Sequence, residues 1–441
     1  SARRMYYPVL HRIVTKSFIV RVVTKKKYTN MIKTCRHCHT DFNITDQDQQ
    51  FYQSRNFPIP TLCPDCRLQR RMTWRNDRTF YVRRCDLTGQ QFVSMYPLTA
   101  PFPVYQPSAW YGDQWDPLRY GQDIDFNQSF FEQWHTLMLQ VPRLGIDIIN
   151  CENSDFCNYC GDDKNCYLDI AGEANEDCYY NLFTKYSKNC VDCTFVYHSE
   201  LCYEAISCYQ CHNIVYSSYL DDCIECLFSY DLKGCRNCAF STNLRHKNYY
   251  LFNQSYSEAD YRSALKELQL DTAPGWQNAI KRYQKILQQQ AIHRAAYIVN
   301  SEQCTGNDIK NSHNVHQAFN VTNCENSKYL YDVLDAKDCY DLNYSLYNPE
   351  NSYELISTLQ LRHSAFSMAS HYCSDIFYCD QCNNSSDLFG CIGLSKAKFC
   401  ILNKQYDAAE YERLKQKLID HMKTTGEWEE FFPTKLSPFA Y

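Results

Sequence analysis

Four cysteines near the start of the 441-residue chain have the spacing of a zinc site. Cys35 and Cys38 form one Cys-x-x-Cys pair, and Cys63 and Cys66 form a second pair after a connection of 24 residues. Each pair can present two thiolates from one tight turn, and four thiolates at tetrahedral angles fill the coordination sphere of Zn²⁺. We therefore expect one structural Zn²⁺ held by a zinc ribbon, with the two neighbouring histidines as bystanders.

An arginine-rich segment follows the second pair. At helical spacing, most of its basic residues and one tryptophan share a continuous face. Guanidinium groups bind phosphates with two hydrogen bonds, and an indole can stack on a base. Alternatively, the stripe packs against carboxylates and aromatic rings elsewhere in the chain. The residues expected to bind nucleic acid are Arg67, Arg70, Arg71, Trp74, Arg75, Arg78, Arg83 and Arg84.

Charge is distributed unevenly along the chain. Residues 1–84 contain 18 Lys and Arg against 5 Asp and Glu, a net charge of +13, whereas residues 85–441 contain 27 against 45, a net charge of −18. A basic head suits a polyanion such as RNA or a protein–RNA assembly, or it docks on its own acidic body. No apolar run is long enough to span a membrane, and thiolate pairs fit a reducing interior, so we expect a cytoplasmic protein.

From about residue 148 the chain consists of short pieces with Asn or Asp before Cys and often Tyr after it, as in Asn165-Cys166-Tyr167 and Asp177-Cys178-Tyr179. Short repeats without helical periodicity predict stacked strands with Asn and Asp at the corners, where a left-handed backbone is tolerated. The fold class we expect is mainly β with helical insertions: an N-terminal zinc ribbon and an internally duplicated, parallel β-helix-like solenoid.

The duplication is visible as matches 150 residues apart, such as Cys223 with Cys373 and Tyr261 with Tyr411. The segments we expect are a basic tail (1–30), the zinc ribbon with its arginine-rich helix (31–84), an aromatic and proline-rich module (85–147) with a helix over 126–139, solenoid copy 1 (148–256), a helical insertion (257–298), solenoid copy 2 (299–406), and a C-terminal helix and tail (407–441).

The cysteines of the repeats also include Cys-x-x-Cys pairs. Counterparts 150 residues later are often not ligands: Ile376 stands for Cys226, and Asn343 for Cys193. A position that accepts isoleucine is a packing position, where cysteine acts as a small hydrophobe. We favour packing over additional zinc or an iron–sulfur cluster. In the aromatic module, Cys85 begins a knuckle that lacks a second cysteine, so no metal is expected there.

The motif set of the head resembles a family of cysteine- and tyrosine-rich zinc-ribbon proteins found in bacteria of the candidate phyla radiation. The resemblance covers roughly residues 31–441 and implies a zinc ribbon with a repetitive body, and no particular activity. The matching motifs are Cys35 with Cys38, Phe51-Tyr52, Pro58, Pro60-Thr61, Cys63-Pro64, Cys66-Arg67, Arg70-Arg71, Arg75-Asn76, Tyr81, Cys85-Asp86, Trp115-Asp116-Pro117, Tyr120-Gly121 and Val141-Pro142-Arg143.

Three functions fit these patterns. The first is a non-enzymatic, zinc-binding protein that binds nucleic acid, with RNA favoured and the ribosome as one setting, and uses the solenoid as a scaffold. The second is a structural protein that self-associates, because solenoids stack unless capped. The third is a carbohydrate-active β-helix enzyme using paired acids such as Asp162-Asp163 or Asp221-Asp222. Adjacent residues on a strand point to opposite faces, which disfavours the third.

Overall fold

The computed structural model describes residues 30–54, 57–335, 343–346, 354–428 and 430–439, so the basic tail lies outside the described residues except for Asn30. Its contacts define two compact units, residues 1–63 and 64–441. In the first unit, β1 (Met31–Thr34) pairs antiparallel with β2 (Asp41–Ile44), and α1 (Asp46–Ser54) follows.

The second unit begins with short elements that precede the repeats. The helix expected over 126–139 is present as α4, which starts later because Ser129 and Glu132 form a capping box, and ends at Val141, before Pro142. The elements are α2 (Pro64–Met72), β3 (Tyr81–Arg84), β4 (Gln91–Ser94), β5 (Val104–Tyr105), α3 (Pro107–Trp110), η1 (Pro117–Tyr120), α4 (Phe130–Gln140) and β6 (Arg143–Leu144).

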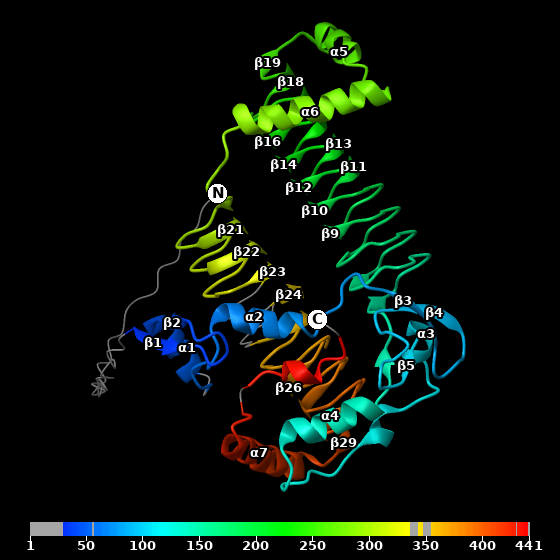
Figure 1. Ribbon diagram of the computed structural model, residues 1–441, viewed down its shortest axis with the longest axis vertical. Coiled ribbons are helices and arrows are strands. Elements are labelled where there is room, and N and C mark those ends of the chain that lie inside the picture. Colours follow the sequence, from blue (N-terminus) through cyan, green and yellow to red (C-terminus); the bar gives the residue numbers. More distant parts are fainter. Residues whose placement is uncertain (1–29, 55–56, 336–342, 347–353, 429, 440–441) are drawn as a thin grey trace, which may run out of the picture. The chain divides into compact units, whose positions relative to one another are not determined.

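Parallel strands dominate the rest of the chain, which is therefore mainly β, as expected. In the first array each parallel pairing joins residues 12 apart; Leu182 pairs with Thr194, which pairs with Ile206. Successive strands of this array lie side by side in Figure 1. The strands are β7 (Ile148–Ile149), β8 (Cys160–Gly161), β9 (Leu182–Lys185), β10 (Thr194–Tyr197), β11 (Glu200–Tyr203), β12 (Ile206–Tyr209), β13 (His212–Val215), β14 (Ser218–Asp221), β15 (Ile224–Leu227), β16 (Tyr230–Lys233), β17 (Arg236–Ala239), β18 (Asn248–Leu251) and the antiparallel β19 (Gln254–Ser255).

Two helices, α5 (Glu258–Glu267) and α6 (Ala273–Gln289), separate this array from the second one. The second array consists of β20 (Ile298–Val299), β21 (Thr305–Lys310), β22 (His316–Thr322), β23 (Tyr331–Leu334), β24 (Asn343–Leu346), β25 (Ile356–Leu359), β26 (Ser374–Phe377), β27 (Ser386–Phe389), β28 (Lys398–Ile401) and β29 (Lys404–Gln405), followed by α7 (Ala408–Thr425) and η2 (Thr434–Leu436).

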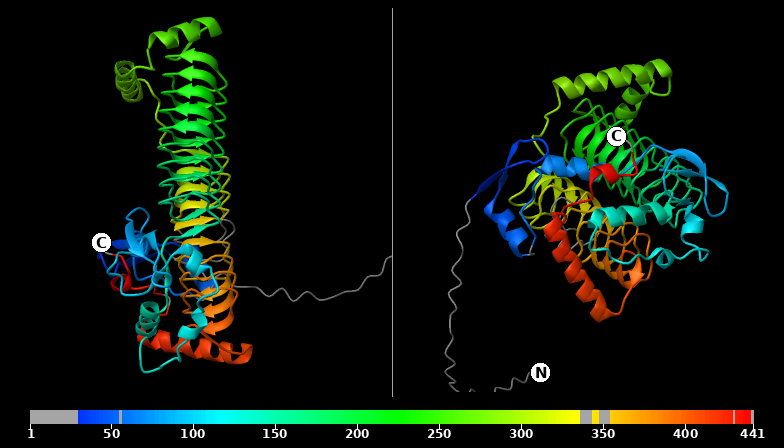
Figure 2. Two further views of the ribbon diagram at one scale, coloured as in Figure 1. Left: turned by 90° about the vertical axis from the view of Figure 1, so that its right-hand side faces the viewer. Right: turned by 60° about the horizontal axis from the view of Figure 1, so that its bottom comes forward.

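Within each 12-residue repeat, the backbone conformation itself repeats every three residues. Every third residue from Asn150 to Phe252, Gly234 among them, has a positive φ, which turns the chain at a corner. The corners include Asn165 and Asp177, as the sequence predicted, but also many bulky residues, for which this conformation costs about 1–2 kcal/mol. Successive turns of the backbone stack on one another along the first array (Figure 2). The residue after each corner points inward, and most of these inward side chains are small and buried.

The inward residues are polar or sulfur-containing for a reason of hydrogen bonding. The pairing uses other N–H groups, as when Glu152 N donates to Asp163 O at 2.9 Å. Many inward N–H groups instead donate to the inward side chain one repeat earlier, as Cys193 N does to Asn181 Oδ1 at 2.8 Å and Cys211 N to Ser199 Oγ at 3.0 Å. Because buried N–H groups need acceptors, Ser, Asn and Cys suit this interior.

Aromatic corner residues stack on their equivalents one repeat away. The rings of Phe183 and Phe195 lie 5.0 Å apart and nearly parallel, and those of Phe228 and Phe240 lie 4.9 Å apart. Such stacking offsets part of the cost of the left-handed corners. It also gives the abundant aromatic residues of the repeats a structural role.

The two arrays have matching elements, offset by 150 residues at both ends. Strand β15 corresponds to β26 and β18 to β28, but β10 and β24 differ by 149. One repeat of the second array is 11 residues long, from Ile298 to Ile309, and another is 13 long, from Asn343 to Ile356. The sequence match of Cys193 with Asn343 was therefore wrong by one residue.

Equivalent helices cover the last strands of both arrays. Tyr261 of α5 lies against Tyr249 in the first array, and Tyr411 of α7 lies against Phe399 in the second. Both tyrosines are buried. Helix α6 also contacts the first array, since Tyr283 donates a hydrogen bond to Ser229 O at 2.8 Å. In the described part of the chain, no helix has both the length and the apolarity to cross a membrane.

The narrow interior makes a testable prediction. Cys202 is 1% exposed, so the larger side chain in Cys202→Leu must displace packed neighbours and should lower the free energy of unfolding by about 1–3 kcal/mol. Urea unfolding measures the change, with Leu201→Ala as the control because Leu201 is 45% exposed. Equal midpoints for Cys202→Leu and the wild type would contradict the assignment of Cys202 to a tightly packed interior.

Candidate metal centre and the arginine-rich helix

The first cysteine pair lies in the tight turn between β1 and β2. The Cys35 N–H donates to Thr40 O at 2.9 Å, and the His39 N–H donates back to Cys35 O at 3.0 Å. His39 has a φ of 60°, which closes the turn. Both thiols of the pair are thus presented by one short loop, as the sequence predicted.

The second cysteine pair lies at the start of a helix. Cys63 precedes α2, and Cys66 is in its first turn, after Pro64 at the first helical position. The N-terminal end of a helix carries partial positive charge, which stabilises thiolates there. A zinc ribbon would carry this pair on a second hairpin, so the sequence prediction of a ribbon is corrected.

The four sulfur atoms of Cys35, Cys38, Cys63 and Cys66 lie within 4.8 Å of one another. Those of Cys38 and Cys63 are 3.7 Å apart, close to the edge of a tetrahedron with Zn–S bonds of about 2.3 Å. Burial raises the pKa of Cys35, but hydrogen bonds from the backbone of Cys63, Cys38 and His37 lower it to about 6. The donor set therefore fits a structural Zn²⁺.

The arginines of α2 do not form the accessible face expected from the sequence. Arg70 binds Glu354 at 2.8 Å and Glu430 at 2.8 Å, both through its guanidinium group. Arg71 donates to Asn343 Oδ1 at 2.6 Å, and Arg67 lies 5.5 Å from the ring of Tyr329. All three arginines are buried, so the stripe packs against the protein itself, which is the alternative left open above.

Of the other predicted nucleic-acid-binding residues, three make contacts within the protein and two are exposed. Trp74 is buried against Trp134 and Phe432. The side chain of Arg75 binds Asp77 and lies 3.9 Å from the centre of the Tyr159 ring, and Arg83 binds Asp86. Arg78 and Arg84 are exposed.

A counterpart of the first hairpin with a single cysteine lies in the aromatic module. Cys85 N donates to Gln90 O and Gly89 N to Cys85 O, which repeats the hydrogen bonds of the Cys35 turn. The Cys85 sulfur accepts the N–H of Gln106, the residue before α3, at 3.4 Å. Burial raises the pKa of Cys85, and a hydrogen bond with the Thr88 side chain is the main interaction that lowers it below its usual value. Hydrogen bonds thus hold this single cysteine in its turn.

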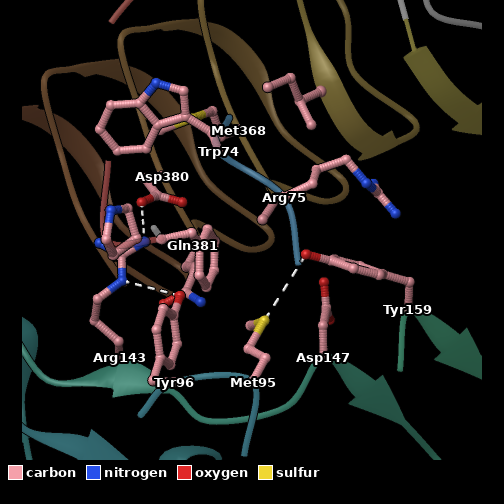
Figure 3. Close-up of a pocket in the computed structure, with 14 residues that line it drawn as sticks. Trp74, Arg75, Met95, Tyr96, Arg143, Asp147, Tyr159, Met368, Asp380 and Gln381 are labelled. Carbon is pink, nitrogen blue, oxygen red and sulfur yellow. Dashed lines mark hydrogen bonds and ion pairs between the residues drawn. The ribbon is translucent and has the colours of Figure 1, made fainter. Parts of the chain in front are cut away.

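A small cavity in the second unit is lined by charged groups (Figure 3). Arg143 pairs with Asp380 and donates to Tyr96 Oη at 3.3 Å, which ties the aromatic module to the second array. Burial raises the pKa of Tyr96. The cavity offers about 30 Å³ to the centres of water-sized groups, which suits ordered water and is too small for a sugar ring.

The paired acids considered for catalysis are separated by the fold. Asp163 is buried inside the first array, whereas its neighbour Asp162 is exposed. Asp221 forms an ion pair with Lys233 at 3.1 Å. Adjacent carboxylates therefore do not face one substrate together.

One polar cluster was missed by the sequence analysis. Asp163, Cys166 and Asp169 are all buried, and one ligand atom from each lies within 4.8 Å of the others. The three-residue spacing was the available signal, because it points all three side chains inward. Like most inward cysteines, such as Cys190, Cys166 donates its thiol hydrogen to a backbone carbonyl two residues earlier.

Comparison with known proteins identifies the metal-binding segment. Residues 31–74 match a family described as a probable treble clef domain, and the arrangement of hairpin, helix and four cysteines agrees. This segment is a treble clef zinc-binding domain. A search of curated proteins gave no significant match. Among solved structures, a UDP-N-acetylglucosamine acyltransferase from Campylobacter jejuni aligns with 9% identity and a TM-score of 0.09, covering 66% of this chain and 94% of its own.

Replacing Cys63 by serine should remove one equivalent of zinc per chain, because three thiolates no longer fill the tetrahedron. Metal analysis of the purified protein measures the ratio. Cys85→Ser is the matched control, since Cys85 lies in the hydrogen-bonded hairpin. Equal zinc contents in both variants would contradict the assignment of the centre.

After its metal has been removed, the protein should bind Zn²⁺ with an affinity that falls steeply below pH 6. The Cys35 thiol has its pKa lowered from about 9 to about 6, so its thiolate is present above pH 6 and is lost as the pH falls through that value. Titration with Zn²⁺ against a competing chelator at pH 5 to 8 measures this. A pH-independent affinity would refute the prediction.

Proposed function

We propose that the protein is a non-enzymatic scaffold: a pair of parallel β-solenoids with a zinc-binding domain whose helix holds the chain together. The main support is the in-register pairing of residues 12 apart through four parallel ladders in the first array, for example at Glu152, Asp155, Asn158 and Gly161. The left-handed corner at every third residue supports it too. A chain that turns four times in 12 residues forms closed rungs around an interior with room only for side chains.

Ion pairs inside the protein support a structural role for α2. Arg70 joins Glu354 of the second array to Glu430 near the C-terminus, and the side chains of Arg70 and Glu354 are 10% and 1% exposed. Breaking such a buried pair leaves an uncompensated charge, which costs about 3–5 kcal/mol. The arginine-rich helix is therefore an internal tie between segments that are far apart in sequence.

The capping helices bear on the alternative of self-association. Solenoids polymerise through exposed terminal strands, and native proteins prevent this by covering them. The last strands of the arrays, β18 and β28, pair with the antiparallel β19 and β29 and contact α5 and α7. We therefore propose presentation of the sides of the arrays to a partner, in the cytoplasm, rather than growth from their ends.

Nucleic acid remains a second candidate ligand, favoured by the net charge of +13 over residues 1–84. Its contacts would differ from those expected from the sequence. Arg78 and Arg84 are the exposed members of the predicted set, whereas Arg67, Arg70 and Arg71 are buried. RNA, or a protein–RNA assembly, would then bind beside α2 and not through its buried arginines.

The scaffold proposal predicts that Arg70→Ala lowers the free energy of unfolding by about 3–5 kcal/mol, because buried Glu354 keeps only the more distant Arg71, 3.9 Å away, to offset its charge. Urea unfolding followed by tryptophan fluorescence measures the loss, with Leu68→Ala as the control on the same helix, since Leu68 is 39% exposed. RNA affinity should be unchanged in folded Arg70→Ala and reduced in Arg78→Ala. An unchanged unfolding midpoint with lost RNA binding would refute the internal tie.

A further inference from the structure

The Asp–Cys–Asp cluster, which we define as Asp163, Cys166 and Asp169, occupies three of the four inward positions of a single repeat. Asp163 is 1% exposed, Asp169 is 0% exposed, and Cys166 is 2% exposed. Two carboxylates and a thiol thus face one another in an interior that excludes water. Ionised carboxylates are stable in such a place only with a compensating positive charge.

The hydrogen bonds around the cluster leave two oxygen atoms without a donor. Asp163 Oδ1 accepts the Asn175 N–H at 2.9 Å, and Asp169 Oδ2 accepts the Asn175 side-chain N–H at 2.8 Å. Asp163 Oδ2 and Asp169 Oδ1 accept no hydrogen bond from the described residues. Lys164, which is adjacent in sequence, points outward and pairs with Glu152.

The fourth inward position of this repeat is Gly172, and its missing side chain makes space for the carboxylates. A Cβ atom there would lie 2.5 Å from Asp169 Oδ2 and 2.9 Å from Asp163 Oδ2. Gly172 is not among the glycines with a positive φ, so its backbone does not require glycine. Space beside the two carboxylates is therefore the reason for this residue.

Neighbouring repeats show that the fold itself does not need the acids. One repeat later, the positions of Asp163 and Asp169 hold Asn175 and Asn181, which serve the same ladders as neutral acceptors. At the same level of the second array, Ser312, Val315, Ala318 and Val321 are buried. Asparagine would meet the hydrogen-bonding need, so the charge of Asp163 and Asp169 calls for a separate explanation.

We propose that the cluster is a second metal site, in which Asp163, Cys166 and Asp169 bind one divalent cation inside the first array. Two carboxylate oxygens and one thiolate are a mixed hard and soft donor set, which suits Zn²⁺ better than Ca²⁺ or Mg²⁺. The cation neutralises the buried acids and engages the two oxygens that have no donor. With this second site the chain would bind two metal ions, whereas the sequence predicted a single zinc ion.

A proton is the competing occupant. Burial raises the pKa of Asp163 to about 6 and raises that of Asp169 as well, so the two carboxyl groups can share a proton instead. With a shared proton, the Cys166 thiol keeps the role it has in other repeats and donates to the carbonyl of Lys164 at 3.3 Å, whereas a cation would use its sulfur. The two occupants therefore differ in metal content and in the effect of replacing this cysteine.

Metal content per chain tests the proposal on the full-length protein purified in the presence of Zn²⁺. We expect two equivalents in the wild type and one in the double variant Asp163→Asn with Asp169→Asn, which should fold because the next repeat has asparagine at both positions. Cys166→Ser should also lose the second equivalent, whereas Cys178→Ser, at the same position one repeat later, should keep it.

The variant Cys63→Ser separates the two sites, because it should keep one equivalent when the treble clef centre is lost. One equivalent in the wild type, or two in the double asparagine variant, would overturn the proposal in favour of the shared proton. Loss of metal in Cys178→Ser together with Cys166→Ser would also overturn it, since it would assign the metal to the thiols in general.

Discussion

Inward-facing amide groups impose the constraint on which the rest of this structure depends. Where the chain turns at every third residue, many inward N–H groups donate to side chains and not to backbone carbonyls, and most of the interior side chains are small. Side chains one repeat earlier supply the acceptors, as Ser154 Oγ does for Cys166 and Asn175 Oδ1 for Ser187. The many cysteines of the repeats follow from this need, since cysteine is small, apolar enough to pack, and able to accept a weak hydrogen bond.

Local patterns in the sequence were sufficient to predict features that depend on neighbouring residues. The spacing of Cys35, Cys38, Cys63 and Cys66 predicted the metal centre, and Asn165 and Asp177 stand at left-handed corners as expected. Features that depend on distant partners were not predictable. Glu354 lies 284 residues from Arg70, so nothing near the arginine stripe indicated burial. The three-residue period was also missed, although the Cys-x-x-Cys pairs at Cys190, Cys208, Cys223 and Cys235 are spaced by multiples of three.

The chain fastens a hairpin to a helix in two chemically different ways. In the treble clef domain, the four sulfur atoms of Cys35, Cys38, Cys63 and Cys66 lie within 4.8 Å of one another, an arrangement that fits a structural metal ion. In the aromatic module, Cys85 performs the corresponding task with the N–H that precedes α3. The first link needs deprotonated thiols and a metal supply, whereas the second needs neither. Acid or chelation therefore acts on the head of the protein while leaving the second hairpin in place.

The 11-residue and 13-residue repeats of the second array show how the number of residues in such an array can change. Losing one residue shifts every later side chain from the interior to the surface or to a corner, and only a compensating gain restores the phase. Gaining or losing 12 residues keeps the phase and alters the height by one strand spacing, about 4.8 Å. The distance between the two ends of an array can thus change during evolution in uniform steps of one repeat. Such a change leaves the inward positions of the other repeats as they are.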